Sequence, residues 1–244
     1  MRTFAKLTWL ELKLIVREPL AVVFVFAFPL VVLMVLIGSF EPNDPAFGGA
    51  KPSDYYLAGY VGVVIAAVGL ISTPTHIAAY RERGVLRRFR ASSLSPWSIL
   101  AAQLAVGILT AGIGSLVLVL VGRVAFGAAL PVSVTRVVLA FVLATASLLA
   151  VGFLLGSLAR SARSAQAIGT LLFFPLWLLS GAGPPPEVMS GGMRAVSEAL
   201  PLTYVVRALQ DPWLGTGSGG GALALLAALL VAATLLSVRF FRTT

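Results

Sequence analysis

Residues 137–159 read VVLAFVLATASLLAVGFLLGSLA, an uncharged run that lies between Arg136 and Arg160. A helix needs about 20 mostly apolar residues to cross the hydrocarbon core of a bilayer. This run is long enough, and a helix is its expected form because backbone polar groups in lipid must be satisfied within the segment. The stretch therefore predicts a transmembrane helix.

Similar uncharged runs recur along the whole chain. We predict spans over residues 20–40, 55–79, 97–122, 137–159, 164–182 and 219–239. The 244 residues are 59% hydrophobic and only 11% charged, whereas soluble domains carry about 25% charged residues. The sequence therefore predicts a single all-α integral membrane domain, residues 1–244, with six transmembrane helices.

The basic residues are distributed unevenly between the two sides of this topology. With the N-terminus inside, thirteen of the 18 Lys and Arg residues face the cytoplasm and five face outward. Because cytoplasmic loops carry the excess of Lys and Arg, we expect both termini to be cytoplasmic. The net charge of +9 then reflects topology and attraction to anionic lipid, and we expect no nucleic-acid partner.

Several chemistries lack the residues they need. The chain has no cysteine and one histidine, His76, so we expect no metal site. We interpret His76 as an interfacial residue near the cytoplasmic end of the second span. No Gly-Lys-Ser or Gly-Lys-Thr is present, so a phosphate-binding loop of that type is absent. The spans hold no ionisable group near mid-membrane, which counts against proton coupling.

These absences bear on function. We expect no catalytic residue and no independent enzymatic activity, and the energy for any transport would come from another chain. A stand-alone secondary carrier or channel remains an alternative, and a membrane-embedded enzyme is the weakest one. The hydroxyl side chains within the spans are expected to bond their own helix backbone or to pack between helices.

Residues 1–18 have the pattern of an amphipathic helix at the cytoplasmic interface. Four basic residues fall on one stripe at helical spacing, next to an apolar face that would rest on the membrane. They are Arg2, Lys6, Lys13 and Arg17. The segment is either a topology anchor or a surface that contacts a partner.

The loop of residues 80–96 carries more charge than a connection needs. It holds five arginines together with apolar Val85, Leu86 and Phe89, which a loop that only joined spans would not require. We interpret it as a docking surface for a cytoplasmic protein, with a solvated anchor as the alternative. The candidate residues are Arg81, Glu82, Arg83, Gly84, Leu86, Arg87, Arg88 and Phe89.

Residues 183–212 form the third distinctive segment, on the outer side. Its prolines and glycines forbid one continuous helix, so we expect two short helices at or within the outer leaflet. Irregular backbone at that depth needs protein or water around it, which indicates an external gate; a loop on the headgroups is the alternative. The candidate residues are Gly181, Pro186, Glu187, Pro201, Thr203 and Tyr204.

Taken in order, these features resemble the ABC-2 type permeases, the membrane subunits of bacterial ABC exporters, over essentially the whole chain. The resemblance rests on the six-span layout with its N-terminal interfacial helix and on short motifs. The motifs are Glu82-Arg83-Gly84, Leu94-Ser95-Pro96, Ser180-Gly181, Pro186-Glu187-Val188-Met189 and Pro201-Leu202-Thr203-Tyr204. The chain departs from the family at Ser190, where a proline is frequent, and at Gly181-Ala182-Gly183, where bulky aromatics are common.

The resemblance implies a half-transporter. Residues 80–96 would be the coupling segment that seats in a groove of an ABC ATPase, and residues 183–212 an external re-entrant hairpin. Two copies of the ATPase would bind ATP and Mg²⁺, while this chain would hold no cofactor. A second permease subunit, identical or related, would complete the pathway in the bacterial cytoplasmic membrane.

The resemblance also suggests a direction and substrate classes. It implies outward movement of a hydrophobic or amphiphilic compound, as in drug and antibiotic exporters of the daunorubicin-resistance type. Export of a polysaccharide or cell-wall precursor by the same machinery is the alternative. We interpret the spans as poor in aromatic residues, which favours hydrophobic compounds over sugars.

Overall fold

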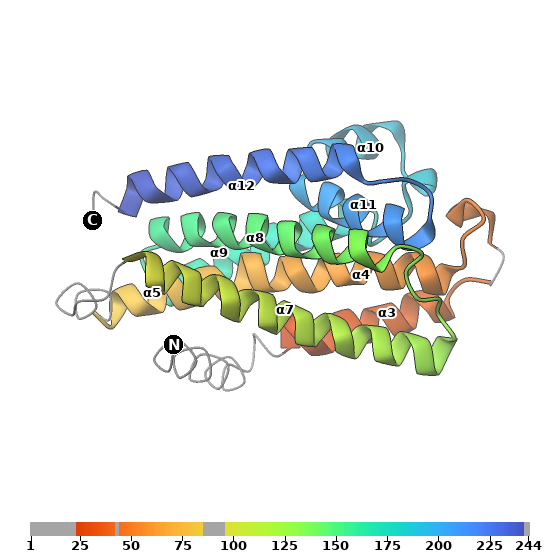
Figure 1. The fold of residues 1–244 in the computed structure, drawn as a ribbon, viewed down its shortest axis with the longest axis horizontal. Helices are drawn as coiled ribbons and strands as arrows, with labels where there is room; N and C mark the ends of the chain where they lie inside the picture. The colour runs from red at the N-terminus through yellow and green to blue at the C-terminus, as the bar shows by residue number, and fades with distance from the viewer. Residues whose placement is uncertain (1–22, 42–43, 85–95, 242–244) are drawn as a thin grey trace.

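The computed structural model describes residues 23–41, 44–84 and 96–241, and within these ranges every regular element is a helix (Figure 1). The all-α prediction is therefore confirmed for the described part of the chain. The predicted interfacial helix, with Arg2, Lys6, Lys13 and Arg17, lies outside the described residues. So does much of the loop of residues 80–96, including Leu86, Arg87, Arg88 and Phe89.

The elements follow one another as apolar helices joined by short connections. Two of them, η1 and η3, are π-helical turns, and η2 and η4 are short 3-10 helices. In chain order they are η1 (Val23–Ala27), α3 (Phe28–Gly38), η2 (Pro45–Phe47), α4 (Pro52–Ala67), η3 (Val68–Ser72), α5 (Thr73–Glu82), α7 (Pro96–Phe126), α8 (Val134–Leu158), α9 (Ala162–Leu179), η4 (Pro186–Val188), α10 (Gly191–Glu198), α11 (Pro201–Leu214) and α12 (Gly220–Phe241).

Among the described residues, five helices are long and apolar enough to cross a membrane. They cover Pro52–Glu82, Gln103–Phe126, Val134–Leu158, Ala162–Leu179 and Gly220–Ser237. The helix over Val23–Gly38 is also apolar but shorter. A bilayer is the solvent that such helices require, so the chain is a multi-pass membrane protein.

The helix formed by α4, η3 and α5 runs through the centre of the bundle. α3, α7, α8, α9 and α11 pack around it, while α12 lies outside against α8 and α11 (Figure 1). Buried residues fill it almost from end to end, including His76, which is 6% exposed. Its Nδ1 lies 2.8 Å from the carbonyl oxygen of Ser72. Neighbouring helices therefore cover the His76 side chain, and our interpretation of it as a residue near the membrane interface stays a prediction.

The bundle has two distinct ends (Figure 1). One end, here called the hairpin end, carries η2, η4, α10 and α11, and the opposite end carries the end of α5 and the start of α9. Hydrogen bonds join three segments at the hairpin end. The carboxylate of Asp54 accepts from the Ala129 N–H at 2.7 Å, and Trp213 Nε1 donates to the Ala129 carbonyl oxygen at 3.1 Å.

Two helices pack very closely against the π-turn η3. Pro74 follows it and lacks the N–H that a regular helix would donate to the Leu70 carbonyl. A side chain at Gly169 would collide with that same carbonyl oxygen, and one at Gly152 would collide with the carbonyl oxygen of Gly69. Only glycines on α8 and α9 therefore allow these helices to approach η3, and such turns are frequent at functional sites.

Candidate functional site

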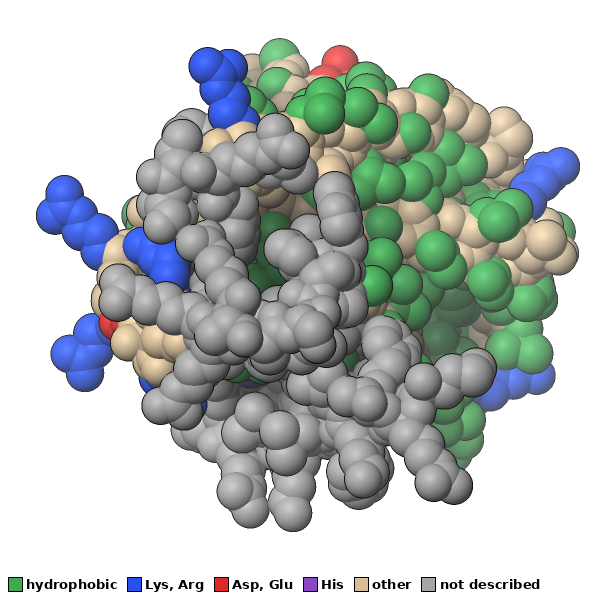
Figure 2. Space-filling view, turned by 60° about the vertical axis from the view of Figure 1, so that its left-hand side comes forward, with side chains coloured by type: hydrophobic (Ala, Val, Ile, Leu, Met, Phe, Trp, Pro, Cys, Tyr) green, Lys and Arg blue, Asp and Glu red, His purple; other side chains and the backbone are tan. Residues whose placement is uncertain are grey.

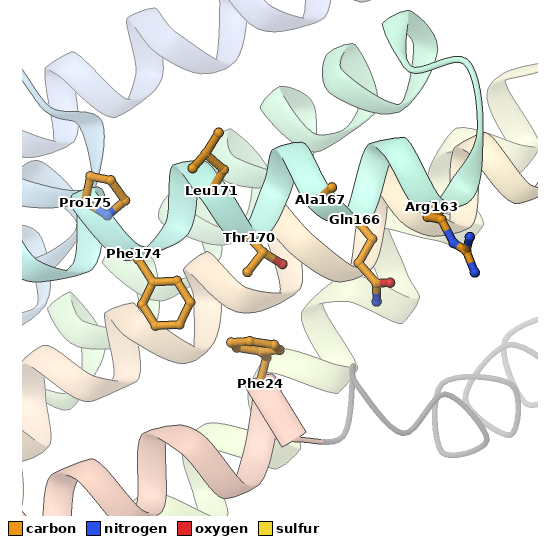
Figure 3. A pocket seen from close by; sticks show the side chains of 8 residues that line it. All are labelled: Phe24, Arg163, Gln166, Ala167, Thr170, Leu171, Phe174 and Pro175. Carbon is orange, nitrogen blue, oxygen red and sulfur yellow. The ribbon is translucent and has the colours of Figure 1, made fainter.

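A groove opens between η1 and α9 (Figure 3). Its volume is about 660 Å³. The lining residues are Phe24 of η1 and Arg163, Gln166, Ala167, Thr170, Leu171, Phe174 and Pro175 of α9. Ser161 caps α9, since its hydroxyl accepts from the Ser164 N–H at 3.0 Å, and this cap fixes where the helix and its lining residues begin.

The groove changes character along α9. Arg163, Gln166 and Thr170 provide polar groups over the first turns, whereas Leu171 and Phe174 provide apolar surface further along (Figure 3). Gln166, Thr170 and Phe174 are four residues apart and therefore share one helix face. Such a surface suits a ligand that has a polar head and an apolar body.

A cluster of aromatic rings lies between the Val23–Gly38 helix and α9. The ring of Phe28 meets Trp177 at 5.3 Å and Phe174 at 5.8 Å between centroids, both edge to face. Phe24 meets Phe174 at 6.0 Å. The Trp177 Nε1 donates to the hydroxyl of Tyr60 at 3.2 Å, which extends the cluster to the central helix. Our premise that the spans are poor in aromatic residues is therefore wrong, because rings from three separate predicted spans gather in one place.

At the opposite end from the hairpin, Arg81 joins α5 to α8. Its guanidinium donates to the carbonyl oxygens of Ser157 and Ala159, the latter at 2.9 Å. These carbonyls stand at the end of α8, where no further helical N–H can reach them. A cation at this position is also favoured by the helix dipole. Arg81 therefore fixes the end of α5 against the short turn between α8 and α9.

Three more residues of the predicted coupling segment are described, namely Glu82, Arg83 and Gly84, and their surroundings differ from those of Arg81. Glu82 is the last residue of α5, and both Glu82 and Arg83 are exposed. Gly84 has a φ of +65°, a left-handed conformation that suits glycine after a helix end. In Figure 2, which turns this end of the bundle toward the viewer, Lys and Arg side chains project from its rim. Glu82 and Arg83 are thus exposed to their surroundings, whereas the partly buried Arg81 side chain is bonded to the end of α8.

The predicted gate residues lie together at the hairpin end. Tyr55 donates its hydroxyl hydrogen bond to the Gly181 carbonyl oxygen at 3.0 Å, and Pro186 begins η4 beside Gly181. Glu187 is exposed. These contacts place the end of α9, the η4 turn and the start of the central helix next to one another.

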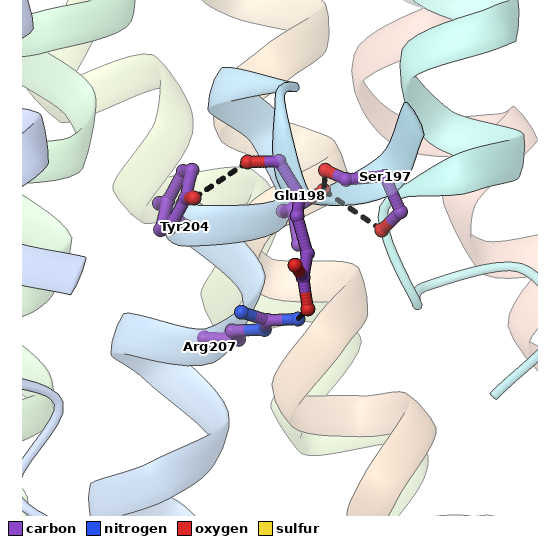
Figure 4. A network of polar contacts seen from close by, with 5 residues as sticks. Ser197, Glu198, Tyr204 and Arg207 are labelled. Atoms are coloured by element: carbon purple, nitrogen blue, oxygen red, sulfur yellow. Dashed lines mark hydrogen bonds and ion pairs between the residues drawn. The ribbon is translucent and has the colours of Figure 1, made fainter. Parts of the chain in front are cut away.

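The short helices α10 and α11 form a turn that is closed by side chains. Pro201 begins α11, the hydroxyl of Thr203 donates to the Ser197 carbonyl oxygen at 2.6 Å, and that of Tyr204 donates to the Glu198 carbonyl oxygen at 2.5 Å (Figure 4). Residues 183–212 thus contain α10 and most of α11. This agrees with the prediction of two short helices in this segment. Exposed Met193 and Val196 give α10 an apolar surface.

Sequence reasoning missed the groove residues and the partners of Arg81. The spacing of Gln166, Thr170 and Phe174 could have indicated a shared face on α9, but no local signal pairs that face with Phe24. The carbonyls of Ser157 and Ala159 are backbone groups, which carry no sequence signal. Both features depend on how the helices pack.

Comparison with known proteins identifies the family to which the chain belongs. The model of the ABC-2 type transporter family matches residues 2–212. The chain is also similar to the inner membrane transport permease YhhJ of Escherichia coli (strain K12) and to its namesake in Shigella flexneri, each 25% identical over 175 residues. That match covers 70% of this chain and 44% of each relative, so the chain spans less than half of their length. The family model covers well over half of the sequence, and the chain therefore belongs to the ABC-2 type transporter family.

Proposed function

We propose that the chain is the transmembrane permease subunit of an ATP-driven exporter, which moves a hydrophobic or amphiphilic compound outward. The observation that carries the proposal is the groove between η1 and α9. Polar Arg163, Gln166 and Thr170 border one part of it and Phe24 and Phe174 another, in a chain of the ABC-2 type transporter family. The groove suits a substrate that partitions into the membrane with its polar head near one surface.

The proposed topology places six spans in the cytoplasmic membrane of a bacterium with both termini inside. Residues 80–96 then lie in the cytoplasm, and residues 183–212 lie outside as a re-entrant hairpin. Three features support this arrangement. Basic residues gather on the proposed inner side, α10 has exposed apolar side chains, and the Val23–Gly38 helix continues the apolar pattern of the longer spans. The similar permeases are named as inner membrane proteins.

The proposed energy source is a separate ABC ATPase. Two copies would bind ATP and Mg²⁺ and would dock through residues 80–96. Arg81 supports this role, because it ties the stem of that segment to the turn before α9. A movement of the docked segment would then reach α9, whose side chains line the groove. The chain itself would act as a conduit and not as an enzyme.

A second permease subunit would complete the pathway. α9 exposes the apolar side chains of Ile168, Leu171, Leu172, Phe174 and Leu178. A paired copy, identical or related, would cover this face and would turn the open groove into an enclosed passage. The gate residues around Gly181 and Tyr204 would lie above it at the hairpin end.

The aromatic side chains of the groove favour a second candidate substrate class. Phe24 and Phe174 present ring faces or edges, and rings pack well against the apolar faces of other molecules. A lipid-linked polysaccharide or cell-wall precursor would place its lipid on this surface. Drug-like or antibiotic-like compounds would use the same surface, and the two classes differ in the size of the polar head.

Transport by reconstituted vesicles tests the proposal. The chain is co-expressed with candidate ABC ATPases of the same genome, purified as a complex and placed in inside-out vesicles. We expect ATP-dependent uptake of a fluorescent cationic or neutral amphiphile, and a lipid-linked oligosaccharide serves as the second probe. Uptake by the chain alone, without any ATPase or ATP, would instead indicate a secondary carrier.

A further inference from the structure

A second cavity, of about 420 Å³, lies at the hairpin end between α11 and the start of α12. It is separate from the groove on α9. The lining residues are Tyr204, Arg207 and Asp211 of α11, Ser218, Gly219, Gly220, Gly221, Ala222 and Leu225. Tyr204, Arg207 and Asp211 follow one another at intervals of three and four residues, which places them on one face of the helix.

Arg207 has hydrogen-bonding capacity to spare in this cavity. In the described part of the chain its ion-pair partner is Glu198, at 3.8 Å between Nη2 and Oε1 (Figure 4). Its guanidinium also lies 5.9 Å from the centre of the Tyr204 ring. The ring is fixed by the bond from its hydroxyl to the Glu198 carbonyl oxygen. A guanidinium has five N–H donors, so Arg207 can still bind an anion such as a phosphate.

Asp211 supplies a negative group one turn further along α11. Burial raises the pKa of its carboxyl above the ordinary value, although nearby Arg207 acts in the opposite direction. A side chain at Gly217 would lie 3.4 Å from Asp211 Oδ2. Gly219, Gly220 and Gly221 leave the neighbouring wall without side chains. The cavity therefore offers a cation and an anion side by side, with backbone as one wall.

An apolar strip leads away from the cavity along α12. Leu225 borders the cavity and is 49% exposed. Val231, Leu235 and Leu236 are exposed further along the same helix. Because α12 is packed against the bundle on one side only, this strip faces outward over a length that suits acyl chains.

We propose that this cavity binds the headgroup of a zwitterionic amino-phospholipid of the phosphatidylethanolamine type. The phosphate would bind Arg207, the ammonium group would bind Asp211, and the acyl chains would lie along α12 from Leu225. A cation and an anion in one cavity match a headgroup that carries both charges, whereas a purely anionic headgroup would be repelled by Asp211. The inference concerns a bound lipid and does not depend on ATP-driven transport.

Native mass spectrometry of the detergent-purified chain tests the inference. Phosphatidylethanolamine and phosphatidylglycerol with the same acyl chains are added at equal concentration. We expect the wild type to retain phosphatidylethanolamine about tenfold better, and Arg207→Gln to weaken its binding about tenfold or more. Asp211→Asn should abolish the preference between the two lipids. Arg194→Gln on α10, an exposed arginine that does not border the cavity, is the matched control and should bind as the wild type does.

Soluble competitors distinguish a headgroup site from an anion site. Glycerophosphoethanolamine should displace the lipid, whereas the same concentration of inorganic phosphate should not. Displacement by phosphate alone, equal retention of the two lipids by the wild type, or equal weakening by Arg207→Gln and Arg194→Gln would each overturn the inference. If Arg207→Gln fails to give a monodisperse protein, Asp211→Asn and the competitors still decide the outcome.

Discussion

Arg81 and Ala159 are joined by a hydrogen bond of 2.9 Å, in which Nη2 of the arginine donates to the backbone carbonyl oxygen at the end of α8. The same guanidinium also bonds the Ser157 carbonyl. One side chain therefore connects the stem of the proposed coupling segment with the turn that precedes α9. Since α9 lines the groove and α5 also packs directly against α9, this contact is one of the connections between the two proposed working parts.

We expect Arg81→Gln to uncouple these parts. The substitution leaves two helix-end carbonyls without their cationic donor, so the free energy of unfolding should fall by about 1.5–3 kcal/mol. ATP-driven uptake should fall more than binding of the ATPase does. Arg160→Gln is the matched control, because Arg160 is an exposed arginine directly after Ala159 and lies outside residues 80–96. Vesicle uptake and co-purification measure the two effects, and an equal loss of uptake in both variants would contradict the role of Arg81.

The groove can be blocked without disturbing its surroundings. Thr170 borders the groove on α9, so Thr170→Trp should fill much of it and should lower uptake at least about tenfold, because the large ring occupies the substrate's space. Leu139→Trp changes an exposed residue of α8 that does not border the groove, and it should transport normally. Uptake assays on folded, ATPase-bound complexes make the comparison. Normal transport by Thr170→Trp would contradict the assignment of the groove.

Two tyrosines on the central helix form a matched pair. The Tyr60 hydroxyl accepts from Trp177 Nε1, whereas the buried Tyr56 hydroxyl has no hydrogen-bond partner within the described residues. Tyr60→Phe should therefore lower the unfolding free energy by about 1 kcal/mol. Tyr56→Phe should be neutral or stabilising, since it removes an unsatisfied polar group. Denaturant or thermal unfolding in the same detergent compares them, and a larger loss for Tyr56→Phe would contradict the contacts described.

The close approach at η3 predicts a sharp difference between glycines. Gly152→Ala should lower stability by about 1–3 kcal/mol or more, because the new methyl group collides with the Gly69 carbonyl. A side chain at Gly112 of α7 would meet no other atom. Gly112→Ala should therefore stabilise the protein by about 0.5–1 kcal/mol. Melting temperatures of the two purified variants test the packing, and similar values would show that α8 does not contact η3 this closely.

Asp211 predicts a pH dependence of stability in lipid-free detergent. Its pKa is raised in the folded protein, so the folded state binds more protons than the unfolded state between the ordinary pKa, about 3.9, and the raised value. Its contribution therefore becomes less favourable as pH rises through that window. The stability of Asp211→Asn minus that of the wild type should increase between pH 4 and pH 7. A decrease in this difference would contradict the raised pKa.

The spans were predictable from the sequence because each carries its own signal. The uncharged run of residues 137–159, for example, coincides closely with the helix Val134–Leu158. The prolines and glycines of residues 183–212 likewise predicted separate short helices. The hydroxyls also behave as expected in part: Thr145 bonds the Phe141 carbonyl, and Ser147 bonds both its own helix and the Leu226 carbonyl of α12. These features are local, so composition and spacing suffice.

The site was not predictable in the same way. Phe24, Tyr60 and Trp177 lie in three different helices, and nothing in the sequence says that their rings gather. Nor does it reveal the π-turn at η3, which places bare carbonyls against glycines of α8 and α9. The burial of His76 follows from the central position of its helix and not from its neighbours in sequence. Each of these features is a product of packing between helices.

The most direct test of the proposed function measures transport and ATP hydrolysis together. The purified chain is reconstituted with its co-purifying ABC ATPase in inside-out vesicles. The fluorescent amphiphile is added to the solution outside the vesicles. We predict that uptake requires both ATP and the ATPase, and that reversing the charges at Arg87 and Arg88 abolishes both ATPase binding and uptake. Uptake that persists without ATP, or ATPase binding that is unchanged by the charge reversal, would contradict a permease driven through residues 80–96.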